Sequence, residues 1–181
     1  DQAIKQLKAG DLVGIFPEAT ISRSFEIKEF RQGAARIAYE AGVPLIPLTI
    51  WGSQRVWTKG RKPIWRPKET QLVITVGKPV EVTEDAQATT ERLHQTMVEQ
   101  MDLTRQRWEE RFGPMPKGEF WVPAALGGAA PTLEEATVQD RADAAARKEK
   151  RAKEKAEAER RAAAEARARE QATGINKILG P

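Results

Sequence analysis

A strand–helix–strand pattern in the first third of the chain constrains its fold most strongly. Leu12–Phe16 is a short apolar run, and the apolar positions of Phe30–Ala41 are spaced four, three and four residues apart, as on one helical face. Gly42 ends that helix, and Pro44–Ile50 is a second apolar run. Because a strand, a helix and a strand in this order almost always form a right-handed parallel unit, we predict an α/β fold with a mostly parallel sheet and flanking helices.

Further elements fit around this unit. A helix is expected at Gln2–Ala9 and is ended by Gly10, and Leu72–Val76 is predicted to be a third strand. A long helix is predicted to begin at Thr83-Glu84-Asp85, because a hydroxyl cap followed by acids favours a helix start. It should end near Phe112 and bury one side, which comprises Leu93, Met97, Met101, Thr104 and Trp108.

Composition divides the chain into a globular part at 1–122, a Pro/Gly/Ala linker at 123–133 and a tail at 134–181. The Pro/Gly/Ala-rich segment at 114–131 is expected to meander and to be pinned by residues 120–122. The tail is rich in Ala, Glu, Lys and Arg, and contains oppositely charged pairs four residues apart, such as Glu157 and Arg161. It lacks the repeating apolar seam of a coiled coil. We therefore expect a long charged helix or a disordered tail, either solvated or in contact with anionic lipid or a partner.

The composition excludes several classes of site. The chain has no cysteine, so it has neither disulfides nor a thiol nucleophile, and no cluster of metal ligands is visible, so no metal is expected. No apolar run reaches the roughly 20 residues that span a bilayer. A net charge of +4 and an isoelectric point near 9.4 favour anionic partners without choosing among them.

The residues that follow the first apolar run carry the clearest chemical signal. Segment 16–22 reads Phe-Pro-Glu-Ala-Thr-Ile-Ser, Arg23 follows it, and segment 30–33 reads Phe-Arg-Gln-Gly. Together they place a carboxylate, two hydroxyls and two guanidinium groups near the end of a predicted strand, where α/β proteins usually bind ligands. The structural alternative is that Glu18 caps the next segment or pairs with an arginine.

The order of these segments resembles the glycerolipid acyltransferases. Their third conserved block reads Phe-Pro-Glu-Gly-Thr-x-Ser, and Val-Pro-Leu-Ile-Pro-Leu at 43–48 resembles their fourth block. The lysophosphatidate (1-acyl-glycerol-3-phosphate) acyltransferases are the most similar branch. In this family a His-x4-Asp motif and a phosphate-binding block precede the third block. The resemblance therefore implies a glycerol-3-phosphate acyltransferase-like fold that is truncated at its N-terminus, with the catalytic histidine and aspartate upstream of Asp1.

The resemblance also implies an activity. Enzymes of this family move a fatty acyl group from acyl-CoA or acyl carrier protein to the free hydroxyl of a lysophospholipid, with the histidine as general base. No cofactor beyond this acyl donor is expected. The complete enzyme should act in phospholipid synthesis at the cytoplasmic face of a membrane, peripherally or through its missing N-terminus, and this fragment should be inactive alone. The alternatives are another acceptor, such as glycerol-3-phosphate or a glycolipid precursor, or a non-catalytic module that binds lipid or a partner.

The third block is implied to hold the acceptor. The residues that match it, or that supply nearby cationic groups, are Glu18, Thr20, Ser22, Arg23 and Arg31. Hydroxyl groups can donate to phosphate oxygens, and a guanidinium can bind phosphate through two hydrogen bonds. The chain departs from the block at two positions. Ala19 replaces the usual Gly, so a positive φ there would be strained, and Ile21 replaces a common Arg whose phosphate contact Arg23 can supply.

Segment 51–68 combines three tryptophans with six basic residues and no acid. Tryptophan favours membrane interfaces, and each basic residue near anionic lipid contributes about 1 kcal/mol. The predicted membrane-interface residues are Trp57, Arg61, Lys62 and Trp65. The alternative is a loop whose tryptophans pack on the domain. A single-strand nucleic-acid site would need an OB-like or RRM-like strand pattern, which is not visible, so we expect no nucleic acid as a partner.

His94 is the only histidine. With Glu99 it imitates the His-x4-Asp spacing, but it follows the Phe-Pro-Glu block instead of preceding it, and residues five apart on a helix have poor mutual geometry. We therefore expect His94 to lie on a helix surface without a catalytic role.

Overall fold

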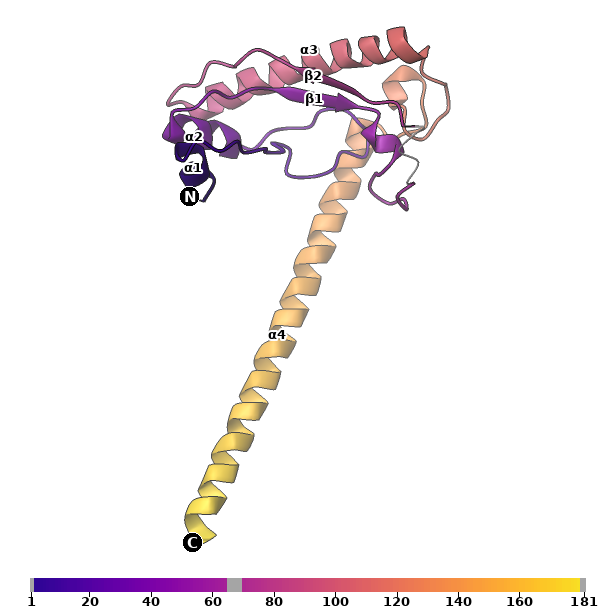
Figure 1. Cartoon of the computed structure of the whole chain (residues 1–181). Coiled ribbons are helices and arrows are strands. Elements are labelled where there is room, and N and C mark those ends of the chain that lie inside the picture. Colours follow the sequence, from indigo (N-terminus) through magenta and orange to yellow (C-terminus); the bar gives the residue numbers. More distant parts are fainter. Residues whose placement is uncertain (1, 65–69, 180–181) are drawn as a thin grey trace. The chain divides into compact units, whose positions relative to one another are not determined.

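The computed structural model describes residues 2–64 and 70–179, with side chains up to residue 162. The chain divides into two compact units, Asp1–Ala136 and Thr137–Pro181 (Figure 1). The regular elements of the first unit comprise α1 (Gln2–Lys8), α2 (Gly33–Ala41), β1 (Leu48–Trp51), β2 (Val73–Val76) and α3 (Ala86–Phe112), with short 3-10 turns at Ser53–Arg55 and Ala124–Leu126. Helix α4 (Leu133–Leu179) begins at the end of this unit and forms the second.

The helix ends confirm the sequence signals, and one helix start differs from the prediction. Gly42 has a φ of 68° and its amide bonds to the last turn of α2, which is the left-handed stop that glycine provides cheaply. The start of α3 differs from the expected hydroxyl cap followed by acids. The cap is the Asp85 side chain, which accepts a hydrogen bond from the amide of Ala88 at 3.0 Å, and the first turn contains no acid. Gly10 follows α1 and Gly113 follows α3, so both helices end where expected.

The sheet within the described ranges consists of two strands. β1 and β2 pair in antiparallel register, with Leu48 opposite Val76 and Trp51 opposite Val73. An isolated antiparallel bridge from Leu45 to Val80 continues the pairing. Strand burial alternates, because Thr49, Trp51 and Thr75 are buried whereas four apolar residues on the same strands are exposed: Leu48, Ile50, Ile74 and Val76. Both strands contact α3, which runs along the sheet in Figure 1.

The mostly parallel sheet predicted from the sequence is not what the described residues form. Leu12–Phe16 is not a strand, and its Leu12 and Phe16 are 93% and 85% exposed. A strand exists only when a neighbour accepts and donates its backbone hydrogen bonds, and no described segment pairs with these residues. The two predicted strands that do form, at 44–50 and 72–76, lie side by side and run in opposite directions.

The core of the first unit lies where α3, β1 and the segment after α3 meet. Trp51, Trp108, Trp121 and Val122 form one buried cluster. Trp108 contacts the Trp121 ring edge-to-face with centroids 5.5 Å apart, and its indole N–H donates to the Gln71 carbonyl at 3.1 Å. The predicted anchoring of the Pro/Gly/Ala-rich segment by residues 120–122 is confirmed.

Four polar side chains lie buried between α3 and the sheet. The hydroxyl oxygen of Thr104 lies 2.7 Å from that of Thr49 and 2.8 Å from that of Thr75. The Gln100 amide donates to the Thr75 carbonyl at 2.7 Å and lies 3.4 Å from the carbonyl of Pro47. We call these four residues, Thr49, Thr75, Gln100 and Thr104, the polar seam. They hold the helix in register with both strands.

Helix α4 is charged along its described side chains. Four ion pairs join residues four apart, including Lys153 with Glu149 at 2.6 Å and Arg161 with Glu157 at 2.6 Å. These pairs agree with the helical reading of the tail. Among the residues that the structure describes, no helix is both long enough and apolar enough to cross a bilayer.

Candidate functional site

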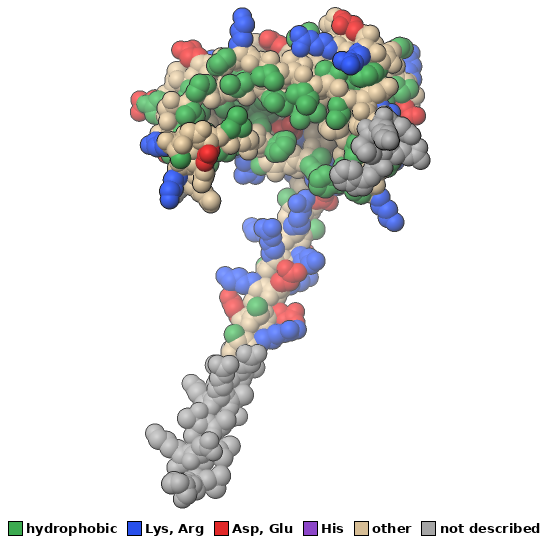
Figure 2. Space-filling model, in the orientation of Figure 1, with side chains coloured by type: hydrophobic (Ala, Val, Ile, Leu, Met, Phe, Trp, Pro, Cys, Tyr) green, Lys and Arg blue, Asp and Glu red, His purple; other side chains and the backbone are tan. Residues whose placement is uncertain are grey.

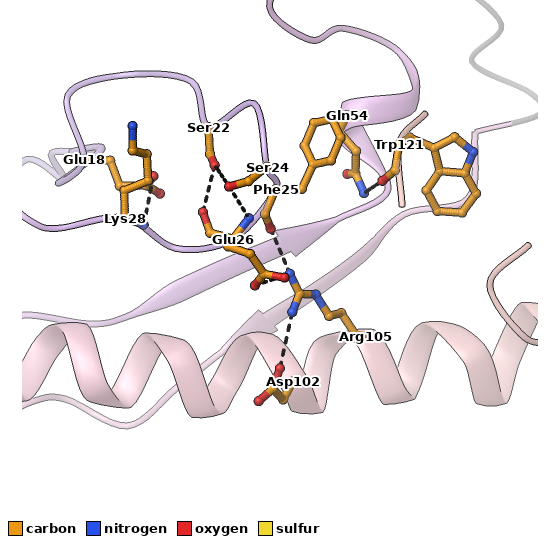
Figure 3. A network of polar contacts seen from close by, with 10 residues as sticks. All are labelled: Glu18, Ser22, Ser24, Phe25, Glu26, Lys28, Gln54, Asp102, Arg105 and Trp121. Atoms are coloured by element: carbon orange, nitrogen blue, oxygen red, sulfur yellow. Dashed lines mark hydrogen bonds and ion pairs between the residues drawn. The ribbon is translucent and has the colours of Figure 1, made fainter. Parts of the chain in front are cut away.

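The polar motif lies on an irregular loop whose two ends are joined by hydrogen bonds. The Arg31 amide donates to the Pro17 carbonyl at 2.9 Å. The Lys28 amide donates to the Glu18 carboxylate at 3.3 Å (Figure 3). A tight turn returns the Ala19 amide to the Phe16 carbonyl at 3.1 Å. We call residues 17–31 the motif loop. Because no strand supports it, its shape depends on these cross-loop bonds.

Glu18 is half-buried at the start of the motif loop. Burial raises the pKa of its carboxyl to about 7, although the hydrogen bond from the Lys28 amide and the charge of Lys28 oppose that rise. At neutral pH the carboxyl group therefore exists in both forms. The ionised form accepts hydrogen bonds, and the protonated form can donate one to an anionic oxygen.

Ser22 is used within the loop. Its hydroxyl donates to the Glu26 carbonyl at 2.8 Å and lies 3.1 Å from the buried Ser24 hydroxyl (Figure 3). Ser24 in turn accepts a hydrogen bond from the Glu26 amide at 3.3 Å. The predicted role of Ser22 as a phosphate donor stays a prediction. Its described contacts give it a structural part in shaping residues 22–26.

Two non-glycine residues of the motif loop have left-handed backbone conformations. Ala19 has a φ of 53° and Phe25 has a φ of 59°. Each such conformation costs a non-glycine residue about 1–2 kcal/mol. The strain expected from an alanine at the glycine position of the motif is therefore present, and surrounding contacts must hold the loop in this form.

A second segment lies against the motif loop. The Lys59 ammonium donates to the Thr20 hydroxyl at 3.5 Å. The next residue, Gly60, is so close to Arg23 that an added Cβ would lie 3.2 Å from the guanidinium. The structure thus brings Thr20, Arg23 and Lys59 to one place. Lys59 was not among the predicted site residues, and no local spacing could have identified it, because 39 residues separate it from Thr20.

Arg31 is anchored to the motif loop by its backbone. Its amide holds the Pro17 carbonyl, and its side chain is exposed. The other predicted basic position, Arg23, lies on the same side of the loop as Lys59 and Gly60. Of the five predicted acceptor-binding residues, Thr20 and Arg23 meet at the Lys59 contact, whereas Glu18 and Ser22 bond within the loop.

The structure buries one part of segment 51–68, which contains the predicted membrane-interface residues, and exposes another. Trp51 is buried in the core, whereas Trp57 is 62% exposed, and Arg61 and Lys62 are exposed as well. The Arg61 guanidinium lies 4.0 Å from the centroid of the Phe120 ring. Trp65 lies outside the described residues. Hydrophobic side chains also gather on the visible face of the first unit (Figure 2).

His94 lies on α3 against the ring of Phe30, edge-to-face at 4.9 Å between centroids. This contact packs the long helix against the residue that begins the Phe-Arg-Gln-Gly segment. Within ranges 2–64 and 70–179, no group of three or more His, Cys, Asp or Glu side chains could hold a metal ion.

Comparison with known proteins gives one consistent result. Residues 1–51 match the family model described as Acyltransferase. A probable 1-acyl-sn-glycerol-3-phosphate acyltransferase of Mycoplasma pneumoniae is 43% identical over 53 residues, which is 29% of this chain and 20% of that protein. A chloroplastic 1-acyl-sn-glycerol-3-phosphate acyltransferase of Brassica napus is 30% identical over 73 residues, covering 40% of this chain and 21% of its own length.

A solved structure is also similar in part. The 1-acyl-sn-glycerophosphate acyltransferase PlsC of Thermotoga maritima has 27% identity and a TM-score of 0.44, covering 60% of this chain and 44% of that one. This chain spans about a fifth of the length of the curated relatives that it matches.

Proposed function

We propose that this chain belongs to the acyltransferase family, whose model its residues 1–51 match, and that the complete protein containing it acylates a lysophospholipid. The acceptor proposed is 1-acyl-glycerol-3-phosphate, which the curated relatives carry in their names. One observation carries the proposal. The motif that matches the family is folded as a closed loop that places Thr20, Arg23 and Lys59 together and keeps Glu18 half-buried beside them in sequence.

The proposed reaction is acyl transfer without a covalent enzyme intermediate. In this proposal, a histidine of the complete protein would remove the proton from the free hydroxyl of the acceptor, and an aspartate would orient that histidine. The hydroxyl oxygen attacks the carbonyl carbon of the acyl thioester, a new ester forms, and the thiol leaves with the proton. The residues of this chain bind and orient the acceptor and do not supply the base.

The anionic headgroup is proposed to sit at the contact between the motif loop and residues 57–62. Arg23 and Lys59 would neutralise the phosphate, and the Thr20 hydroxyl would donate to one of its oxygens. Lys59 supplies positive charge on the side of the motif where Ile21 lacks it. The protonated form of Glu18 can donate a hydrogen bond to an anionic group at neutral pH, because burial raises the pKa of its carboxyl to about 7.

We also propose where the reaction takes place. Trp57, Arg61 and Lys62 are exposed close in sequence to Lys59, and such a surface suits contact with anionic lipid. The enzyme would act at the cytoplasmic face of a membrane and would take its acyl group from acyl-CoA or acyl carrier protein. No further cofactor is proposed.

The test is acylation by the complete protein. Lysophosphatidate and radiolabelled acyl-CoA are incubated with it, and labelled phosphatidic acid is the expected product. Residues 1–181 alone are expected to give none. Glycerol-3-phosphate and lysophosphatidylcholine are offered in parallel, because the departures at Ala19 and Ile21 concern the acceptor. If the complete protein acylates neither lysophosphatidate nor any other acceptor offered, the proposal is contradicted and a non-catalytic lipid-binding module is favoured.

A matched pair of variants tests the headgroup site. Lys59→Met should raise the KM for lysophosphatidate about tenfold, because one charge-assisted hydrogen bond contributes about 1.5 kcal/mol or more. Lys78→Met removes the same charge from a position outside the motif loop and should leave the KM unchanged. Equal effects of the two variants would show that only net charge matters.

A further inference from the structure

Arg105 of α3 contacts the motif loop from about 80 positions further along the chain. Its guanidinium donates to the Phe25 carbonyl at 2.8 Å and to the Glu26 carboxylate at 3.0 Å (Figure 3). The side chain also reaches Asp102, one helical turn earlier, at 3.4 Å. Arg105 therefore joins two successive residues of the loop to a helix of 27 residues.

The guanidinium is held in one orientation. Arg105 is only 7% exposed, and its charged carbon lies 4.7 Å from the centroid of the buried Trp51 ring. Its Nε is buried without a hydrogen-bond partner, so the group is fixed by its two outer nitrogens and by the ring face. A buried arginine with this many directed contacts behaves as a rigid support rather than as a surface charge.

The two loop residues that Arg105 holds determine the loop's shape. Phe25 has the left-handed φ of 59°, which reverses the chain, and its side chain packs against the core cluster. Glu26 presents its carbonyl to the Ser22 hydroxyl and its amide to the Ser24 hydroxyl. Two residues later the Lys28 amide donates to Glu18. The bonds of Ser22 and Glu18 thus both depend on where residues 25–28 lie.

We propose that Arg105 is a positioning residue for the motif loop: it fixes Phe25 and Glu26, and thereby the internal hydrogen bonds of Ser22 and Glu18 that shape the loop whose Thr20 and Arg23 bind the anionic acceptor. This inference rests on the proposed function only for the identity of the ligand. In this proposal Arg105 touches neither the acceptor nor the acyl donor. It attaches the irregular motif loop to α3, which is itself packed against β1 and β2.

The experiment uses Arg105→Lys in the complete protein. In Arg105, Nη2 donates to both loop residues while Nη1 donates to Asp102. Lysine keeps the charge but has one nitrogen on a flexible stem, so it cannot hold the loop and the helix from two nitrogens of a planar group. We expect the KM for lysophosphatidate to rise at least tenfold while kcat changes less than threefold. Arg107→Lys is the matched control, because it makes the same substitution two residues along the same helix at an exposed position. The Arg107 guanidinium donates to the Thr75 hydroxyl of the polar seam and not to the motif loop, so the variant should leave KM within twofold.

A second variant tests the route of the effect. Glu26→Gln keeps the side chain's shape and removes its charge, so it should raise KM less than Arg105→Lys does. In the Arg105→Lys background, Glu26→Gln should add little, since the contact is already weakened. Full additivity of the two variants would overturn the claim that Arg105 acts through Glu26.

Amide hydrogen exchange separates this inference from the proposed function. In Arg105→Lys, the amides of residues 22–28 should exchange at least tenfold faster, whereas those of α3 and β1 keep their wild-type rates. If the wild-type protein acylates no acceptor, the proposed function fails and exchange alone decides the positioning role. Uniformly faster exchange with a lower kcat and an unchanged KM would reduce Arg105 to a stability residue. Wild-type KM and wild-type exchange in Arg105→Lys would overturn the inference outright.

Discussion

Helix α3 supplies polar side chains to two networks that differ in kind. On its sheet side, Gln100 and Thr104 join the polar seam, whose hydroxyls and amide are buried between regular elements. One residue further along, Arg105 bonds to a half-exposed, irregular loop that contains two strained residues. The same helix therefore supports a tightly enclosed network and a partly open one.

Because the polar seam is buried and the motif loop is partly exposed, substitutions in the two networks should have different effects. A buried polar group costs about 1–3 kcal/mol when it loses its partner, so the polar seam penalises any slip of α3 against β1 and β2. The motif loop keeps Thr20 and Ala19 exposed, and its strain is held by contacts from elsewhere. We expect substitutions in the seam to act on stability and substitutions in the motif loop to act on binding and pH dependence.

The largest expected effect is in the polar seam. Gln100→Leu should lower the free energy of unfolding by about 2–4 kcal/mol, because the Thr75 carbonyl and the Thr49 hydroxyl lose the Gln100 amide donor in a buried interface, whereas the Pro47 carbonyl keeps the Gly77 amide. Gln106→Leu, on the exposed side of the same helix, should change it by less than about 0.5 kcal/mol. Urea unfolding followed by tryptophan fluorescence measures both. Equal losses of unfolding free energy in the two variants would show that the buried Gln100 contributes no more to stability than the exposed Gln106.

Ionisation of Glu18 is expected to have the next largest effect on the free energy of unfolding. The stabilising contribution of Glu18 is present only below about pH 7. Folding raises its pKa from 4.5 to about 7, so the folded state favours the protonated form. The stability that it contributes is fully present below about pH 4.5 and is lost as the pH rises to about 7, by about 2 kcal/mol after solvent screening.

The measurement for Glu18 compares unfolding at several pH values with that of Glu18→Gln, which stays neutral. The difference between wild type and variant should fall between pH 5 and 7 and then level off. A difference that is independent of pH would show that the carboxyl is not buried in solution as it is in the structure.

Ala19→Gly should have a smaller and opposite effect. The φ of 53° is strained for alanine, and an added glycine relieves that strain at the cost of more freedom in the unfolded chain. The net gain should be about 0.5–1 kcal/mol in thermal or urea unfolding. Glycine at Ala41, in the last turn of α2, is the control and should destabilise instead. A loss of stability in Ala19→Gly would contradict the left-handed conformation.

The smallest effect is expected in α4, outside both networks. Glu157→Gln removes one exposed ion pair with Arg161, which contributes a few tenths of a kcal/mol. Far-ultraviolet circular dichroism should show a slight loss of helix at low salt and none at 1 M salt, where the pair is screened. A salt-independent loss would point to a cause other than charge.

The local features of the fold were predictable because their causes are local. Gly42, Asp85 and Gly113 mark helix ends by their own conformations and side chains, and the helical tail follows from its composition. The strand at Leu12–Phe16 was not correctly predicted, because an apolar run specifies burial and β propensity but cannot supply the neighbouring strand that it needs.

The candidate site was predictable only in part for the same reason. The Phe-Pro-Glu motif singled out residues 16–23 and their resemblance to the acyltransferases, and Ala19 was recognised as a departure that strains the backbone. Lys59 was noticed only as part of the basic segment 51–68, and Arg105 carried no signal; the contact of each with the motif loop is formed across many residues and could not be predicted.

The sequence alone was enough to indicate candidate residues for the chemistry, the helix ends and the charge of the tail, because these depend on residue type and short spacing. The three-dimensional fold was needed to establish that β1 and β2 pair antiparallel, that burial raises the pKa of Glu18 to about 7, and that Arg105 bonds to the motif loop. The physical reason is that strand pairing, desolvation and long-range hydrogen bonds depend on which segments meet in space.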